Sequence, residues 1–236
     1  MTEEQTSLFP DLQPSTAATA SPGLSRQSKK EVSLFLPGVK NEQSFPEFTR
    51  LDELASQAKQ CENCGLRATC QQVVFAEGLP QARLMFIGEG PGADEDAAGL
   101  PFVGRAGQLL NRILAACAIE RNEVYITNVV KCRPPGNRLP HPDEVKACIG
   151  YLEAQIRIIK PAIIVCLGAL ATQTVIDARA KITSARGVWY SRGDIKLMPT
   201  FHPAALLRRE EWKKPAWEDF KKIRDAYRGL YKEEDR

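Results

Sequence analysis

Histidine is scarce in this sequence: His141 and His202 are the only two among 236 residues. The chain also lacks an apolar run long enough to cross a membrane, and its first residues do not form a secretory signal. A net charge of +3 is too small to indicate a nucleic-acid-binding protein by itself. We therefore expect a soluble cytoplasmic protein whose seven cysteines are reduced.

The beginning of the chain differs in composition from the rest. Residues 1–46 are rich in Ser, Thr, Pro, Gln and Ala and show neither helical nor strand periodicity, which predicts a disordered tail. Helical spacing starts at Leu51. We expect one folded domain over residues 47–236, ending in an amphipathic helix over residues 216–230.

Apolar segments typical of buried strands occur at residues 84–88, 123–130, 162–167 and 195–199. Helical patterns separate them, at residues 104–118, at residues 142–160 and after Gly168. Alternating strands and helices predict an α/β fold. We expect a three-layer α/β/α sandwich with a central, mainly parallel four-stranded sheet.

The first of these strands runs into the glycine-rich loop GEGPGADED, at residues 88–96. Phosphate-binding loops offer free backbone N–H groups without competing negative charge, and they often end in G-K-[ST]. This loop has no such ending and carries Glu89, Asp94, Glu95 and Asp96. It therefore indicates catalysis or base recognition rather than phosphate binding.

Four of the cysteines could form one metal site. Cys61 and Cys64 make a C-x2-C turn, which lets two thiolates face one metal, and Cys132 and Cys148 could complete a four-thiolate set. Structural zinc is an alternative, although the distance from Cys132 to Cys148 is long for a zinc ribbon. Cys70 could replace one ligand.

Two other cysteines do not suggest a metal site. Cys117 lies on the apolar side of an expected helix, and Cys166 lies within an expected buried strand. Both are interpreted as core residues.

Four motifs, together with the four cysteines in this order, resemble those of a known family. The motifs are GEGPGADED, PFVGRAGQLL, TNVVKCRPPGNR and HPAALLR. Residues 51–209 resemble the family 4 uracil-DNA glycosylases, the iron–sulfur members of their superfamily. The resemblance implies a 4Fe-4S cluster on Cys61, Cys64, Cys132 and Cys148. It further implies a monofunctional enzyme that removes uracil from single- and double-stranded DNA, leaves an abasic site and so initiates base excision repair.

The resemblance also assigns the residues that would bind the base. Phe102 would stack on flipped uracil, and the amide of Asn128 would read its N3–H and O4. Glu95 would exclude the C5 methyl of thymine. Backbone groups of Gly90 and Gly92 would contact the substrate; at Gly90 many family members carry alanine.

Catalysis and DNA binding follow from the same motifs. Glu89 would orient water or stabilise the sugar cation, and His202 would donate to uracil O2. Leu206 or Leu207 would fill the gap that the flipped nucleotide leaves, and Arg208 would contact phosphate. His141, between two prolines, is interpreted as a loop residue.

Two other functions stay open at this point. The chain could be a non-catalytic iron–sulfur module that binds lesions, or an iron–sulfur electron carrier without a base pocket. The presence of Glu89, Asn128 and His202 together favours the enzyme.

The tail carries one further signal. Gln5–Phe9 (QTSLF) resembles the motif with which bacterial proteins bind the sliding clamp, a glutamine followed by Leu-Phe. We therefore expect a bacterial, nucleoid-associated monomer whose partners are uracil-containing DNA and the clamp, with no membrane partner.

Overall fold

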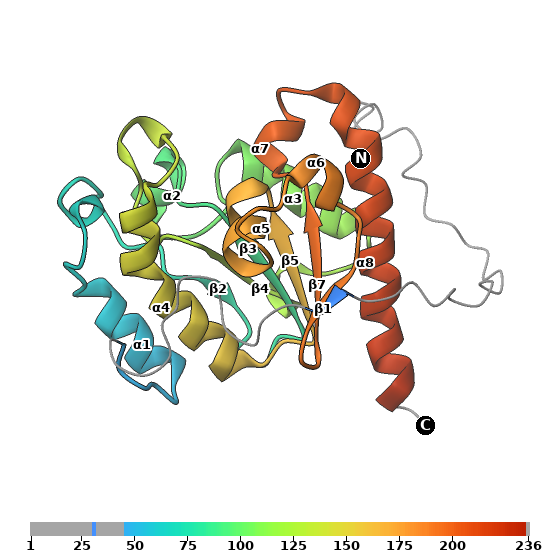
Figure 1. The fold of residues 1–236 in the computed structure, drawn as a ribbon, viewed down its shortest axis with the longest axis horizontal. Coiled ribbons are helices and arrows are strands. Elements are labelled where there is room, and N and C mark those ends of the chain that lie inside the picture. Colours follow the sequence, from blue (N-terminus) through green and yellow to red (C-terminus); the bar gives the residue numbers. More distant parts are fainter. Residues whose placement is uncertain (1–29, 32–44, 235–236) are drawn as a thin grey trace.

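The computed structural model describes residues 30–31 and 45–234 (Figure 1). Most of the expected tail over residues 1–46, including Gln5–Phe9, lies outside the described residues. Within that tail, Lys30–Glu31 forms the two-residue strand β1.

A parallel sheet of four strands forms the centre of the domain. Its members are β3 (Leu84–Gly88), β4 (Tyr125–Asn128), β5 (Ile163–Leu167) and β7 (Ile195–Thr200), in the spatial order β7-β5-β3-β4. This confirms the expected parallel, four-stranded centre.

Short strands extend both edges of this sheet, and the sequence did not predict them. β2 (Glu77–Gly78) pairs antiparallel with β4, and β6 (Tyr190–Arg192) pairs antiparallel with β7. β1 adds to β6 in parallel. The strand order of the whole described sheet is β1-β6-β7-β5-β3-β4-β2.

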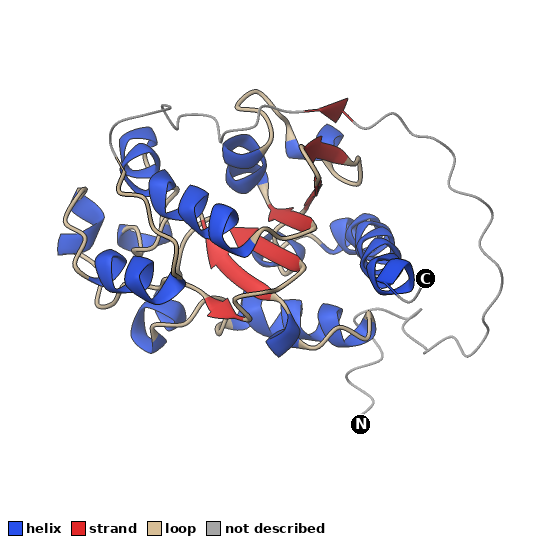
Figure 2. Ribbon diagram, turned by 90° about the horizontal axis from the view of Figure 1, so that it is seen from below, coloured by secondary structure: helices blue, strands red, loops and turns tan. Residues whose placement is uncertain are grey.

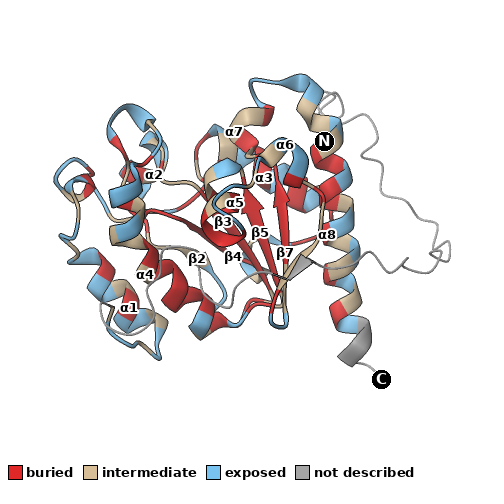
Figure 3. Ribbon diagram, viewed as in Figure 1, coloured by how far each residue is buried: buried red, intermediate tan, exposed pale blue. Residues whose placement is uncertain are grey.

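Helices cover both faces of the sheet, so the fold is a three-layer α/β/α sandwich (Figure 2). Leu84 and Phe86 of β3 pack with α3 (Arg105–Ala116) and α8 (Lys213–Glu234) on one face. Met85 and Ile87 point the other way, toward α4 (Pro142–Ile159) and α5 (Ala169–Val175). Side chains alternate across a strand, and here both faces are apolar because both are covered. Figure 3 shows the central strands as buried.

The remaining elements are short or peripheral. α1 (Leu51–Lys59) packs on the outside of α4 through Leu54 and Ala58. Three short helices lie near the carboxyl ends of the strands: α2 (Ala93–Ala98), α6 (Ile182–Ala185) and α7 (Pro203–Leu206). The 3-10 turns are η2 (Gly65–Ala68), η3 (Arg121–Glu123), η4 (Pro135–Asn137) and η5 (Glu210–Trp212).

The start of α4 shows how a local sequence signal fixes an element. Pro142 occupies the first turn, and the Glu144 carboxylate accepts the backbone N–H of His141 at 2.7 Å. The same carboxylate pairs with Arg138 at 2.6 Å, which lowers the pKa of Glu144 to about 2. His141 is exposed at this helix start, in keeping with its interpretation as a loop residue.

Among the described helices, none combines the length and the apolar character that a membrane crossing requires.

Candidate active site

The parallel strands all end at one edge of the sheet, where their loops surround a cavity of ≈ 520 Å³. Ligands of open α/β sheets bind at this edge. Eight residues singled out from the sequence line the cavity: Glu89, Gly90, Gly92, Glu95, Phe102, Asn128, His202 and Arg208. Residues far apart in the sequence therefore meet at one site.

Asn128 ends β4 at the wall of this cavity, with only 2% of its surface exposed. Its Oδ1 atom is buried and has no hydrogen-bond partner. Burying an amide oxygen without a hydrogen-bond partner costs about 1–3 kcal/mol of folding free energy, unless a ligand supplies the missing donor. Asn128 thus presents an acceptor for a donor group within the cavity.

Phe102 lies near Asn128 on the loop between α2 and α3. Its backbone has φ of 53°, a left-handed conformation unusual for a phenylalanine, and its ring is 5% exposed. The ring centroid lies 5.5 Å from that of His202, with an interplanar angle of 31°. Helix α3 approaches this backbone so closely that a Cβ on Gly107 would lie 1.8 Å from the Phe102 carbonyl oxygen.

His202 caps the N-terminus of α7, immediately after β7. Its Nδ1 atom accepts the backbone N–H of Ala204 at 3.1 Å. Burial and, to a smaller extent, the charge of the nearby Arg208 together lower the pKa of His202 to about 4. The ring is consequently neutral near pH 7, and its proton resides on Nε2, which is a hydrogen-bond donor.

Glu89 follows β3 and is partly buried in the cavity wall. Burial raises the pKa of its carboxyl, while the charge of Arg208 acts in the opposite direction. Arg208 therefore lies close enough to influence both Glu89 and His202. The carboxyl of Glu89, the neutral imidazole of His202 and the guanidinium of Arg208 thus lie in one cavity.

Glu95 has a role that its sequence position does not reveal. One carboxylate oxygen accepts the N–H of Gly92 at 3.0 Å, and the other accepts those of Val103 and Gly104 at 3.0 and 2.9 Å. The side chain thereby joins the start of α2 to the start of α3. Its carboxylate shapes the cavity wall through the backbone of two loops.

The two leucines of the HPAALLR segment point in different directions. Leu206 is 1% exposed and packs in the core with α3 and α8, so it cannot enter DNA. Leu207 is 36% exposed, and Arg208 is also exposed. The prediction of Leu206 as a DNA contact is therefore wrong, because helical geometry turns it inward, and Leu207 is the leucine available at the surface.

The sequence analysis missed three larger side chains of the cavity, Arg138, Phe201 and Trp212. Phe201 and Trp212 stack with their centroids 4.2 Å apart at 11°. Arg138 ends the TNVVKCRPPGNR motif and Phe201 precedes His202, but no spacing rule identifies a stacked pair from different elements. The only signal in the sequence for these cavity residues was their proximity to His202 or to the proline-rich loop.

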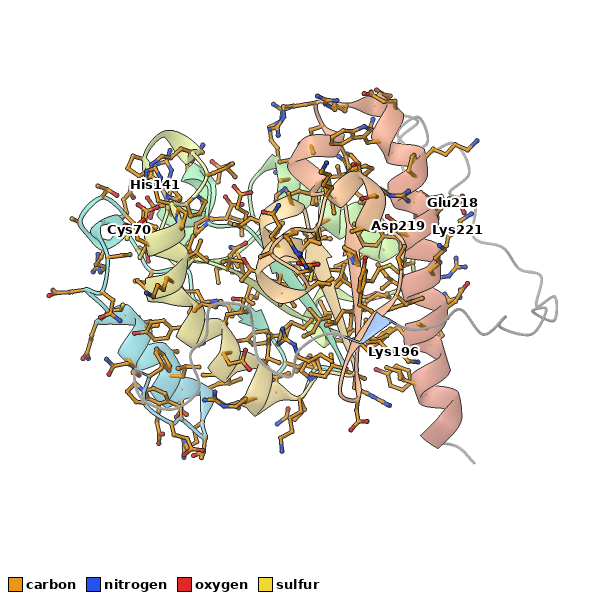
Figure 4. All side chains as sticks on the ribbon, viewed as in Figure 1. Cys70, His141, Lys196, Glu218, Asp219 and Lys221 are labelled. Carbon is orange, nitrogen blue, oxygen red and sulfur yellow. The ribbon has the colours of Figure 1, made fainter. Side chains whose placement is uncertain are left out.

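A buried polar anchor fixes the end of β7 next to His202. Thr200 donates its hydroxyl to Asp219 at 2.7 Å, and Arg186 pairs with the same carboxylate at 2.5 Å. Asp219, labelled in Figure 4, is on the α8 side that faces β7. The helix at the end of the chain thus helps to hold the catalytic edge.

The four candidate metal ligands, Cys61, Cys64, Cys132 and Cys148, line a second, smaller cavity. Burial raises the pKa of the Cys132 thiol, and neighbouring thiols raise it further; burial also raises the pKa of Cys148 to about 11. Thiols in apolar surroundings resist ionisation unless a cationic centre compensates their charge. This donor set fits a thiolate-bound metal group.

Other details of the cysteines bear on the ligand set. Within residues 45–234, no three or more His, Cys, Asp or Glu side chains gather as a single ion would require. Cys70 does not line the cavity, but its thiol lies beside that of Cys132. Cys117 and Cys166 are both 0% exposed, which confirms their interpretation as core residues.

The fold and the cavity at its carboxyl edge place this chain in a known class. A family model described as the uracil DNA glycosylase superfamily matches residues 75–221, and the chain belongs to that superfamily. Its relatives specify the branch. The chain is 45% identical over 184 residues to a type-4 uracil-DNA glycosylase of Sulfurisphaera tokodaii, covering 74% of this chain and 84% of that protein.

Two further type-4 uracil-DNA glycosylases are equally extensive matches. That of Thermotoga maritima is 45% identical over 180 residues, covering 74% of this chain and 93% of the relative. That of Archaeoglobus fulgidus is 41% identical over 181 residues, covering 73% and 91%. The chain therefore belongs to the type-4 branch, as its motifs predicted.

Proposed function

We propose that this protein is a monofunctional uracil-DNA glycosylase that flips uracil out of DNA and hydrolyses its N-glycosidic bond. The observation that carries the proposal is the buried, unpartnered Oδ1 of Asn128, in one cavity with Phe102 and His202. These three side chains supply an acceptor, a stacking surface and a donor. A uracil ring requires all three.

Base recognition follows from this arrangement. The Asn128 oxygen accepts uracil N3–H while its NH₂ donates to O4, a pattern that cytosine cannot satisfy. Stacking on Phe102 contributes about 1–3 kcal/mol toward the cost of flipping. Glu95, by fixing the backbone of Gly92 and Val103, holds the wall that excludes the thymine methyl. Gly90 and Gly92 offer backbone contacts.

Bond cleavage separates an electron-poor sugar from a uracil anion. His202 donates from Nε2 to the O2 atom of the leaving base, where negative charge develops. Glu89 in its ionised form orients a water molecule and stabilises the positive charge on the sugar. The water oxygen bonds to C1′ and gives up its proton, the uracil anion is reprotonated, and an abasic site remains.

DNA contact outside the pocket falls to two exposed neighbours. Leu207 fills the gap that the flipped nucleotide leaves, and Arg208 contacts phosphate. Both single- and double-stranded DNA containing uracil would be substrates.

The cofactor forms a separate part of the proposal. Cys61, Cys64, Cys132 and Cys148 would hold a 4Fe-4S cluster, a group that takes cysteine thiolates as its ligands. When bound, the cluster would join the segment around Cys61 to the loop around Cys132.

Partners and location also belong to the proposal. Gln5–Phe9 would bind the bacterial sliding clamp and keep a monomeric enzyme beside DNA in the nucleoid. These assignments are independent of the glycosylase activity.

One assay separates this function from a non-catalytic lesion-binding module and from an electron carrier. The protein is incubated with uracil-containing single- and double-stranded oligonucleotides, and abasic sites are then cleaved with alkali. We expect strand breaks at uracil only. Tight binding without strand breaks would indicate the lesion-binding module. A protein that neither binds nor cleaves these oligonucleotides would have neither of the two DNA functions.

A further inference from the structure

Lys131 is a buried lysine located between the two cavities. It follows β4 by three residues, is 2% exposed and lines the cysteine cavity. Its ammonium group points back toward the end of β4, at the residue that forms the wall of the active-site cavity. The proposed reaction assigns it no part.

Three neutral oxygens surround this ammonium group. Nζ donates to the carbonyl oxygen of Asn128, to Oγ1 of Thr127 and to Oε1 of Gln155, each at 2.7 Å. An ammonium group has three donors, so this set uses all of them. The group therefore has a defined position rather than a mobile one.

The acceptors belong to a connected network. Gln155 donates from Nε2 to the Tyr125 hydroxyl at 3.0 Å, and Thr127 donates to the carbonyl oxygen of Phe75 at 2.9 Å. The turn from Asn128 to Lys131 is also held to β3, because the amides of Val129 and Val130 donate to Gly88 and Glu89. Lys131 is the member of the network that bonds to the Asn128 peptide itself.

We propose that Lys131 is a positioning residue that fixes the peptide of Asn128, and with it the pyrimidine-reading amide, from the side of the cysteine cavity. This inference rests on the proposed function of Asn128. The Asn128 side chain has no bond of its own on Oδ1, so its orientation depends on the backbone that carries it. The three hydrogen bonds of Nζ, each at 2.7 Å, suit this task.

The test compares two substitutions within the same network. Lys131→Met keeps a long side chain but removes all three bonds of Nζ, including the one to Asn128. Thr127→Val removes one of these bonds and the bond from Thr127 to Phe75, and leaves the bond from Lys131 to Asn128 in place. For each variant, thermal stability, iron content, visible absorbance, affinity for free uracil, and kcat and KM on uracil-containing single-stranded DNA are measured.

We expect Lys131→Met to lower uracil affinity and kcat/KM by about tenfold or more, and to reduce the ratio of uracil to cytosine release. Thr127→Val should remain within about threefold of the wild type. Iron content and absorbance should be unchanged in both.

Equal losses in the two variants at comparable stability would overturn the inference, since they would show a general structural role. Loss of iron from Lys131→Met with unchanged uracil affinity would also overturn it and would place the role of Lys131 at the cysteine cavity. Should Lys131→Met not fold, Lys131→Leu, which likewise lacks a hydrogen-bond donor, provides the same comparison. A wild-type protein that binds uracil but releases none would refute the proposed function, while uracil affinity would still decide the role of Lys131.

Discussion

Gly88 and Asn128 are register partners at the ends of β3 and β4, and a Cβ on Gly88 would lie 2.3 Å from Oδ1 of Asn128. The same Cβ would lie 2.6 Å from the Phe102 ring. One absent methyl group therefore gives room to both the Asn128 amide and the Phe102 ring. Gly88 therefore determines the shape of the pocket, although it is not one of the residues that line it.

Asn128→Asp should weaken the discrimination between uracil and cytosine. The substitution removes the NH₂ that favours O4, so the ratio of uracil to cytosine release should fall by about 10- to 100-fold, or about 1–3 kcal/mol. Matched oligonucleotides with uracil or cytosine at one position provide the measurement. Unchanged selectivity in a folded variant would show that another residue reads the base.

Glu95→Ala should admit thymine and also destabilise the protein. Three backbone N–H groups lose their acceptor, so the free energy of unfolding should fall by about 2 kcal/mol. Release of thymine and the melting temperature are measured together, with Glu95→Gln as the milder variant. If stability falls without any thymine release, the exclusion of the methyl group resides elsewhere.

The pH dependence of base release should reflect the ionisation of Glu89 and not that of His202. The pKa of His202 is lowered to about 4, so its ring remains neutral above pH 5. The pKa of Glu89 is raised by burial, and the rate should therefore decline as the pH falls through a value above that of an ordinary glutamate. Single-turnover rates of Glu89→Gln should lack this acid limb. Persistence of the limb in that variant would assign it to another group.

Protein purified without air should be brown and contain about four irons per chain. Alanine at Cys61, Cys64, Cys132 or Cys148 should reduce the iron content, whereas alanine at the buried Cys117 or Cys166 should not. Colourless protein with stoichiometric zinc would contradict the cluster.

Cys70 provides the internal check on the ligand set, since its thiol lies beside that of Cys132. Loss of iron in Cys70→Ala together with full iron in Cys64→Ala would replace one proposed ligand by the other.

A peptide of residues 1–14 should bind the bacterial sliding clamp with micromolar affinity, about 8 kcal/mol. Two apolar side chains, Leu8 and Phe9, would enter a preformed pocket on the clamp. Titration of a labelled peptide is compared with a Leu8→Ala, Phe9→Ala control. The proposal fails if both peptides bind equally or neither binds.

The strands and long helices were predictable because apolar periodicity determines them. The strand expected over residues 195–199 is β7, and the helix expected over residues 142–160 is α4. By contrast, α2 was missed because its sequence ADEDAA has no apolar face. Glu95 caps its start locally at Gly92, but the other two partners of Glu95, Val103 and Gly104, lie on another loop, and such tertiary contacts leave no local pattern.

The active site was predictable in its parts and less so in its detail. Motif resemblance identified Asn128, Phe102 and His202, which the fold brings to one cavity. It could not distinguish Leu206 from Leu207, because the phase of a four-residue helix is set by packing. Nor could it identify Lys131, whose burial follows from a turn after β4 that no periodicity describes.

The left-handed backbone of Phe102 has a consequence for how this chain can change over time. A residue with a Cβ costs roughly 1–2 kcal/mol in that conformation, which glycine would adopt freely. Glycine at position 102 would relieve that strain but would also give up the packing of a buried phenylalanine, which is worth about 3–5 kcal/mol. A lineage can therefore replace this ring only at a net loss of stability, although the backbone beneath it is strained.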